Sequence, residues 1–162
     1  EMIFLEGYLW DEGEPQQAFD EVINHSNKIA MSLSDKFCVE RHKKNFLDLV
    51  QNKLDIIFSN EQEILELINT KSFDDVISFG KRLSKTLVVT RSSAGSVVIN
   101  KNEVIECESQ KNLKIIDLTG AGDLFAAGFL HGYVNKMSLK DSLSKGTEMA
   151  SKIIQKIGAR LD

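Results

Sequence analysis

The chain has 162 residues, 42% hydrophobic and 27% charged, so it is long enough to form one compact domain with a buried core. Its formal net charge of −4 argues against a nucleic acid or a membrane surface as the main partner. The two cysteines, Cys38 and Cys107, lie far apart without metal-ligand spacing, which favours a reducing cytoplasmic location over a disulfide scaffold.

Short apolar runs alternate with amphipathic stretches along the first half of the chain. The pattern predicts strands over residues 2–5, 28–33 and 54–58, a loop over residues 7–10, and helices from Pro15 onward, over 39–50 and over 60–68.

The second half repeats this alternation, with more strands at its start. It predicts helices over residues 73–84, 122–135 and 139–157, and strands over 86–90, 96–99, 103–107 and 113–116. Strands that alternate with helices predict a three-layer α/β/α fold with a mainly parallel sheet. Ligands of such folds bind beyond the carboxyl ends of the strands, so the loops after the strands are the places to search for a site.

The segment from Asp117 to Gly128 is the most informative loop of this kind. Gly120, Ala121 and Gly122 have almost no side chain, so the backbone there can approach a ligand closely. The helix that follows would point free N–H groups and its positive dipole end at an anion. Asp123 stands where it could take a proton from an attacking hydroxyl group. The combination indicates phosphoryl transfer.

The glycine pair also has other interpretations. A Gly-x-Gly pair at a strand-to-helix turn can serve packing alone. A dinucleotide fingerprint would need a third glycine where Phe125 stands, and a Walker P-loop is excluded because no Gly-Lys-Ser/Thr follows.

The full string closely resembles the second signature of the ribokinase-like (PfkB) carbohydrate and nucleoside kinases. The matching residues are Asp117, Gly120, Ala121, Gly122, Asp123, Ala127 and Gly128, whereas Leu118 departs from the usual Thr or Pro. The resemblance implies an ATP-dependent kinase in which Asp123 is the catalytic base and the Gly120–Asp123 amides form an anion hole.

Two further segments are similar to motifs of the same family, in the same order. Asn60 and Glu63 resemble its Asn-x-x-Glu motif, which implies that Glu63 helps to place Mg2+, usually through water, and that Asn60 lies near the phosphates. An Asn followed three residues later by Glu is also an ordinary helix start.

The second segment resembles the family's nucleotide-lining loop, Thr-x-Gly-x-x-Gly. Thr90 and Gly95 match, and Ser92 replaces the first glycine, which puts a glycine-only backbone conformation at residue 92 in doubt. Arg91 either reaches a phosphate or faces solvent.

The roles of the remaining polar candidates stay open. Asp117 and Thr119 match positions that hold a monovalent cation such as K+ in some relatives, and capping of the strand end is the alternative. His25 and His42 have no partner in the sequence spacing and are expected at the surface, and His131 is expected to pack or to face solvent.

The resemblance extends over residues 1–162 but matches only the C-terminal portion of the family's kinase domain, the part with the ATP-binding and catalytic-base regions. The N-terminal part and the lid have no counterpart, so we expect an incomplete fragment that is inactive alone, with dimer contacts in the missing lid. The implied acceptor is a sugar or nucleoside hydroxyl, on an adenosine kinase-like or fructokinase-like branch. A non-catalytic nucleotide-binding or regulatory module is the alternative.

Overall fold

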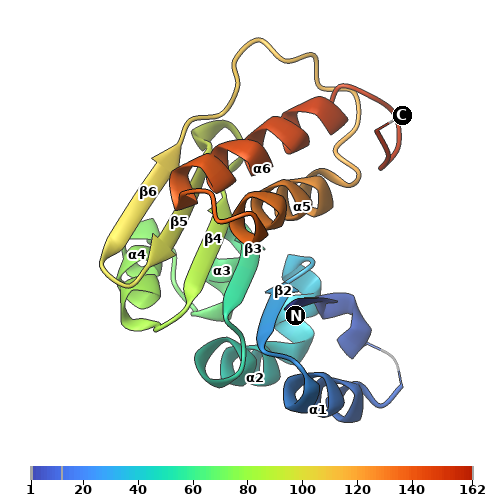
Figure 1. Ribbon diagram of the computed structural model, residues 1–162, viewed down its shortest axis with the longest axis vertical. Coiled ribbons are helices and arrows are strands. Elements are labelled where there is room, and N and C mark those ends of the chain that lie inside the picture. Colours follow the sequence, from blue (N-terminus) through green and yellow to red (C-terminus); the bar gives the residue numbers. More distant parts are fainter. Residues whose placement is uncertain (1, 12, 162) are drawn as a thin grey trace. The chain divides into compact units, whose positions relative to one another are not determined.

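A computed structural model describes residues 2–11 and 13–161 (Figure 1). The predicted domain of residues 1–162 therefore includes three positions, 1, 12 and 162, that lie outside the described residues. The chain divides into two compact units, Glu1–Val89 with Ile99–Glu103, and Thr90–Val98 with Val104–Asp162. They are called the first and the second unit below, and each is described by itself.

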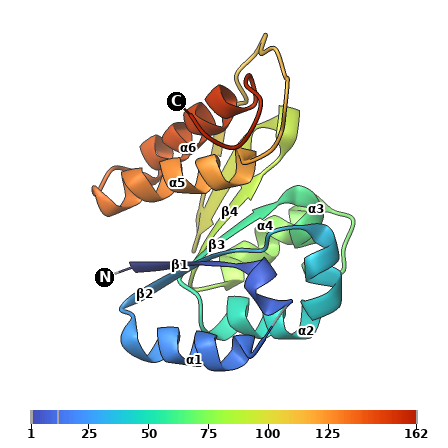
Figure 2. The same ribbon diagram turned by 90° about the vertical axis from the view of Figure 1, so that its right-hand side faces the viewer.

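The first unit is built from alternating strands and helices (Figure 2). In chain order these are β1 (Met2–Glu6), the 3-10 helix η1 (Gly7–Trp10), α1 (Pro15–His25), β2 (Lys28–Ser32), α2 (Lys36–Asn52), β3 (Ile56–Asn60), α3 (Glu61–Leu67), α4 (Phe73–Arg82) and β4 (Thr86–Thr90). Strand β2 pairs in parallel with β1 on one side, where Ala30 lies opposite Phe4, and with β3 on the other, where it lies opposite Ile56. The carboxyl ends of these three strands therefore share one edge.

Fully buried apolar side chains hold the first unit together. They come from its strands and helices alike, and include Met31, Phe46, Ile57, Ile64, Leu67 and Leu87. Burial of one such side chain contributes about 1.5–3 kcal/mol. Helix α2 begins at Asp35, whose carboxylate accepts a hydrogen bond from the Cys38 amide at 2.7 Å.

The second unit contains the 3-10 helix η2 (Ser92–Ala94), most of β5 (Ser96–Asn100) and of β6 (Glu103–Cys107), α5 (Ala121–Val134) and α6 (Leu139–Ile153). Helices α5 and α6 lie side by side (Figure 1). Small residues allow this close approach, because a Cβ at Gly128 would lie 2.7 Å from the Lys145 carbonyl oxygen and one at Gly132 would lie 2.8 Å from Ser142 Cα.

The strand order in the described part of the chain is β1-β2-β3-β4-β5-β6 in a six-stranded sheet. The predicted α/β fold with a mainly parallel sheet is confirmed, and the predicted strands 86–90 and 103–107 have the predicted bounds. None of the described helices combines the length and the apolar character that a membrane crossing requires.

The predicted strand over residues 113–116 is wrong. This segment has no regular secondary structure, and its side chain Ile115 is 64% exposed. The Ile116 amide donates to the Ile154 carbonyl oxygen at 2.8 Å, at the end of α6. An apolar run becomes a strand only where a neighbouring strand accepts its hydrogen bonds, and here the acceptor belongs to a helix end.

Candidate active site

The glycine turn before α5 depends on a backbone conformation that disfavours side chains. Gly120 has φ +76° and ψ 4°, in the left-handed region. A Cβ at this position would lie 2.8 Å from the Ala159 Cβ. Glycine at residue 120 is therefore required both by the backbone and by the space around it.

Asp117 fastens this turn to the segment that follows α6. Its Oδ2 accepts a hydrogen bond from the Gly158 amide at 2.9 Å, and its Oδ1 accepts from the Thr119 amide at 2.9 Å and the Thr119 hydroxyl at 2.7 Å. The amides of Gly158 and Thr119 hold the pKa of Asp117 below its usual value. The carboxylate is thus charged and already engaged by the protein.

The first turn of α5 leaves two amides open. The Ala121 amide donates to the Leu118 carbonyl oxygen at 3.1 Å, and the Leu124 amide donates to the Gly120 carbonyl oxygen at 2.9 Å. Among the described residues, the amides of Gly122 and Asp123 have no such acceptor. A Cβ built on Gly122 meets no atom within 4 Å, so the space beside this amide is open.

Asp123 lies in this same turn and is exposed. Within the part of the chain that the structure describes, its carboxylate makes no hydrogen bond or ion pair. A helix start with free amides binds an anionic group, and an unengaged carboxylate beside it can accept a proton. This is the chemistry that the sequence predicts for the glycine motif.

Asn60 and Glu63 form the reciprocal capping box at the start of α3. Asn60 Oδ1 accepts from the Glu63 amide at 2.9 Å, and Glu63 Oε2 accepts from the Asn60 amide at 2.8 Å. The Asn60 side-chain amide also donates to Glu63 Oε1 at 2.5 Å. Asn60 and Glu63 therefore form the ordinary helix start that their spacing indicates. The same contacts fix the Glu63 carboxylate at the carboxyl end of β3.

Glu63 is an unusual capping residue because only 4% of it is exposed. Its pKa is raised to about 7, chiefly by burial and also by the nearby negative charges of Asp35 and Glu6, against hydrogen bonds from Asn60 that lower it. A buried carboxylate at such a strand end is a candidate partner for a divalent cation.

A polar network next to Glu63 escaped the sequence analysis. Tyr8 Oη donates to Asp35 Oδ2 at 2.5 Å, and Ser34 Oγ donates to Glu6 Oε2 at 3.1 Å. Burial raises the pKa of Asp35, but hydrogen bonds from Tyr8 and the amides of α2 outweigh burial and lower it overall. The pair Ser34-Asp35 directly after β2 was the signal, since strand ends in parallel sheets carry the ligand sites.

The loop after β4 contains the remaining predicted residues, Thr90, Arg91, Ser92 and Gly95. The Arg91 amide donates to the Gly95 carbonyl oxygen at 2.7 Å, which closes the loop. Gly95 has φ +88°, and a Cβ there would lie 2.1 Å from the Cys107 carbonyl oxygen. Ser92 has φ +52°, so it adopts the left-handed conformation that favours glycine although it is a serine.

The structure therefore places the predicted site residues in three sets. The second unit contains one set of Asp117, Thr119, Gly120, Ala121, Gly122 and Asp123, and another of Thr90, Arg91, Ser92 and Gly95; the first unit contains Asn60 and Glu63. Each set is ordered by its own local contacts.

The histidines are placed as expected with one exception. His25 and His131 are exposed, whereas His42 is half-buried and its Nε2 lies 2.7 Å from Asp11 Oδ1. His42 is thus less exposed than expected, and its partner Asp11, 31 residues away in the chain, is one that sequence spacing does not reveal.

Comparisons with known proteins show the family of this chain. The profile of the pfkB family carbohydrate kinases matches residues 11–162. Among curated proteins, the ribokinase of Lactococcus lactis is 28% identical over 94% of this chain and 52% of its own length. The nucleoside kinase of Methanocaldococcus jannaschii is 32% identical over 73% of this chain and 38% of its own length.

Solved structures show the same fold. An adenosine kinase from Sinorhizobium meliloti has a TM-score of 0.94 and 39% identity, over 99% of this chain and 50% of the other. A probable sugar kinase from Rhizobium etli has a TM-score of 0.93 and 37% identity, over 98% of this chain and 50% of the other. The chain thus spans about half the length of the ribokinase and of both solved structures.

Proposed function

The chain belongs to the pfkB family of carbohydrate kinases, and from that premise we propose that it supplies the ATP-binding and catalytic-base portion of a kinase that phosphorylates a sugar or nucleoside hydroxyl. The proposed domain is residues 1–162, as the C-terminal portion of a ribokinase-like kinase. The observation that carries the proposal is the open start of α5, where two free amides lie beside the exposed carboxylate of Asp123.

In this proposal Asp123 is the general base. It accepts the proton of the acceptor hydroxyl while that oxygen attacks the γ-phosphorus of ATP, and ADP leaves in line. The amides of Gly122 and Asp123 donate to the oxygens of the transferred group. Each such preorganised donor lowers the activation barrier by about 3–4 kcal/mol. Gly120 and Ala121 shape the turn that presents these donors.

Glu63 is assigned to Mg2+, because Mg2+ prefers oxygen ligands and keeps several of its waters. The metal would neutralise phosphate charge during transfer. The donor set fits this role, since the Glu63 carboxylate is fixed by Asn60 and presents oxygen atoms only. Asn60 orients the carboxylate and lies at the strand end where a phosphate can approach.

The loop of Thr90, Arg91, Ser92 and Gly95 is assigned to the nucleotide. The hydrogen bond from the Arg91 amide to the Gly95 carbonyl oxygen closes this loop, and Ser92 within it is exposed. The first role proposed for Asp117 and Thr119 is to stabilise the glycine turn. The amides of Gly158 and Thr119 already donate to the two carboxylate oxygens of Asp117. A K+ ion beside them is the second assignment.

The experiment that tests the base is the substitution Asp123→Asn, with Asp74→Asn as a matched control. Asp74 is likewise an exposed acid in the first turn of a helix, α4, but no glycine turn precedes it. In a protein of the full length of the relatives, we expect Asp123→Asn to lower kcat by about 10²–10⁴-fold, with ATP binding and Tm near those of the wild type.

The control variant should keep the wild-type kcat. An Asp123→Asn protein that turns over as fast as the control contradicts the base assignment. Phosphotransfer should be assayed with adenosine, ribose and fructose, because the similar structures are named for a nucleoside and for sugars. ATP binding without transfer to any of these acceptors would favour a non-catalytic nucleotide-binding module.

The 162-residue chain is proposed to be inactive by itself. Phosphoryl transfer requires water to be excluded and the acceptor to be positioned, and the chain spans only about half the length of its relatives. An assay of the isolated chain beside a protein of the full length of its relatives tests this, and turnover by the isolated chain would refute it.

A further inference from the structure

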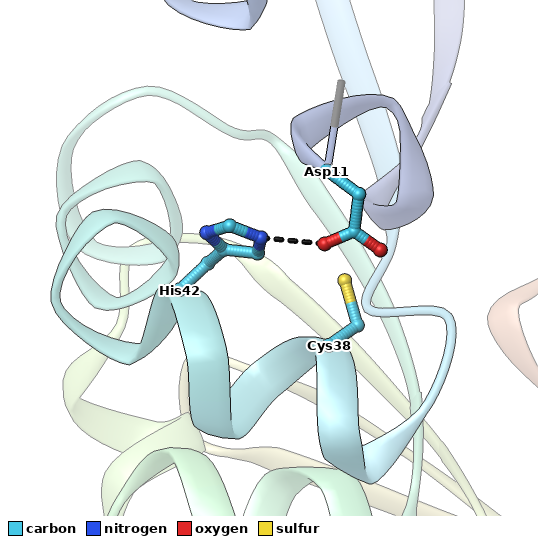
Figure 3. A group of neighbouring side chains, drawn as sticks. All are labelled: Asp11, Cys38 and His42. Atoms are coloured by element: carbon cyan, nitrogen blue, oxygen red, sulfur yellow. Dashed lines mark hydrogen bonds and ion pairs between the residues drawn. The ribbon is translucent and has the colours of Figure 1, made fainter.

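Three side chains with different donor atoms converge where the chain leaves η1 and passes α2 (Figure 3). They are Asp11, Cys38 and His42, and one ligand atom of each lies within 4.8 Å of the other two. The closest pair is His42 Nε2 and Asp11 Oδ1, at 2.7 Å. All three belong to the first unit and none is assigned to phosphoryl transfer.

The local structure explains why these residues meet. Cys38 and His42 are four residues apart on α2, so both side chains project from one face of the helix. The backbone at His42 departs from helical values, with φ −115° and ψ 18°, which redirects the chain at the imidazole. Asp11 caps η1, and its amide donates to the Tyr8 carbonyl oxygen at 3.1 Å.

The Cys38 thiol is the second, independent indication of a ligand. Cys38 is 0% exposed, and within the part of the chain that the structure describes its sulfur has no hydrogen-bond partner. Figure 3 shows the sulfur directed toward the Asp11 carboxylate. A buried thiol without a partner, aimed at a carboxylate and an imidazole, is the arrangement in which a metal ion supplies the missing partner.

We propose that Asp11, Cys38 and His42 bind one divalent transition metal of the zinc class. Thiolate, imidazole and carboxylate are the ligands of Zn2+, whereas Mg2+ and Ca2+ prefer oxygen alone. The metal bonds to Asp11 Oδ1, Cys38 Sγ and His42 Nε2, with water in the fourth position.

On binding, the Cys38 thiol gives its proton to solvent and becomes the thiolate ligand. The imidazole coordinates in its neutral form, with its remaining proton on Nδ1. The hydrogen bond between His42 Nε2 and Asp11 Oδ1 is replaced by two bonds to the metal.

Arg41 limits the affinity of this site and also orients it. Its Nη2 donates to Asp11 Oδ2 at 2.7 Å and its Nε donates to Asp11 Oδ1 at 3.1 Å. The bond to Oδ2 is compatible with a metal on Oδ1 and holds the carboxylate in place, as outer partners of metal ligands do. The contact of Nε with Oδ1 must give way. The bound metal would fasten the end of η1 to α2.

The experiment uses purified protein, stripped with a chelator and kept reduced, and titrated with Co2+ and then Zn2+. We expect a thiolate-to-cobalt charge-transfer band at one metal per site, loss of that band when Zn2+ displaces Co2+, and a higher Tm with Zn2+. The variants Asp11→Asn and Cys38→Ser should each weaken Co2+ binding by at least about tenfold.

The matched control is Cys107→Ser, which removes the other, partly exposed free cysteine and should keep the band. Asp11→Asn leaves the buried thiol intact, so it tests the site even where Cys38→Ser unfolds the protein. No charge-transfer band, or a band that Cys107→Ser abolishes and Asp11→Asn leaves unchanged, overturns the proposal.

Discussion

The two proposed catalytic carboxylates, Glu63 and Asp123, have opposite surroundings. Glu63 is almost fully buried, receives hydrogen bonds from the main chain and side chain of Asn60, and has a pKa raised to about 7 mainly by burial. Asp123 is exposed at a helix start, and in the described part of the chain no side chain or amide engages its carboxylate.

This difference separates a carboxylate that the fold holds in place from one that the fold leaves free. A group that positions a cation benefits from fixed geometry, because the ion then meets preorganised oxygen atoms. A general base must reach a proton on a substrate, so hydrogen bonds within the protein would compete with its function. The two side chains should therefore respond differently to the same change from acid to amide.

The largest expected effect tests this contrast through Mg2+. Glu63→Gln should raise the Mg2+ concentration at half-maximal rate by about tenfold, because the amide keeps the capping box but loses the charge. Asp123→Asn should lower kcat by about 10²–10⁴-fold and leave that Mg2+ concentration unchanged. The measurement is the initial rate of phosphotransfer against Mg2+ at saturating ATP, in a protein of the full length of the relatives.

The control for this prediction is Asp74→Asn, an exposed acid in the first turn of α4, which should leave both kcat and the Mg2+ requirement unchanged. If Asp123→Asn shifts the Mg2+ requirement and Glu63→Gln does not, the two assignments are reversed.

The sequence predicted most of the fold because the strands carry their own signals. The runs Thr86–Thr90 and Glu103–Cys107 are short, rich in β-branched residues and bounded by turn residues, and the structure has strands with those bounds. The run over residues 113–116 carries a similar apolar signal and is not a strand. The sequence does not show that its amides bond to the end of α6.

In the candidate site, too, features set by neighbouring residues could be predicted from the sequence, and features set by distant residues could not. The capping box of Asn60 and Glu63 and the helix start at Gly120 follow from spacing alone, and both are present. The partner of His42 and the charges that raise the pKa of Glu63 could not be predicted, because Asp11, Asp35 and Glu6 are distant from these residues in the chain. Only the fold brings such residues together.

The second prediction concerns pH and the buried charge of Glu63. Its pKa is raised from 4.5 when unfolded to about 7 when folded, so the folded state binds the proton more tightly. Stability from this group is present below about pH 4.5 and is lost as the pH rises through 7, by about 3 kcal/mol. Asp35 and Glu6 are the charged groups that contribute to this shift.

The measurement is the free energy of unfolding of the wild type and of Glu63→Gln at several pH values in metal-free buffer. The difference between them should move in favour of the variant between pH 4.5 and 7 and then stay constant. A difference that is flat over this range would mean that Glu63 is ionised in the folded state without cost.

The third prediction contrasts two neighbouring glycines at the start of α5. Gly120→Ala should destabilise the protein by about 2 kcal/mol, because an alanine with φ +76° is strained and its Cβ would lie 2.8 Å from that of Ala159. Chemical denaturation measures this loss. Unchanged stability would show that the turn can rearrange.

Gly122→Ala, unlike Gly120→Ala, should keep the stability of the protein and lower its activity. The new Cβ meets no protein atom within 4 Å, and alanine is a better helix residue than glycine by about 1 kcal/mol, so stability should be equal or higher. If the γ-phosphoryl group of ATP approaches this backbone, the methyl group occupies its space, and kcat/KM should fall by at least about tenfold. The new methyl group meets no protein atom, so a loss of activity would be due to the ligand. A stable and fully active Gly122→Ala protein would show that the transferred phosphate lies elsewhere.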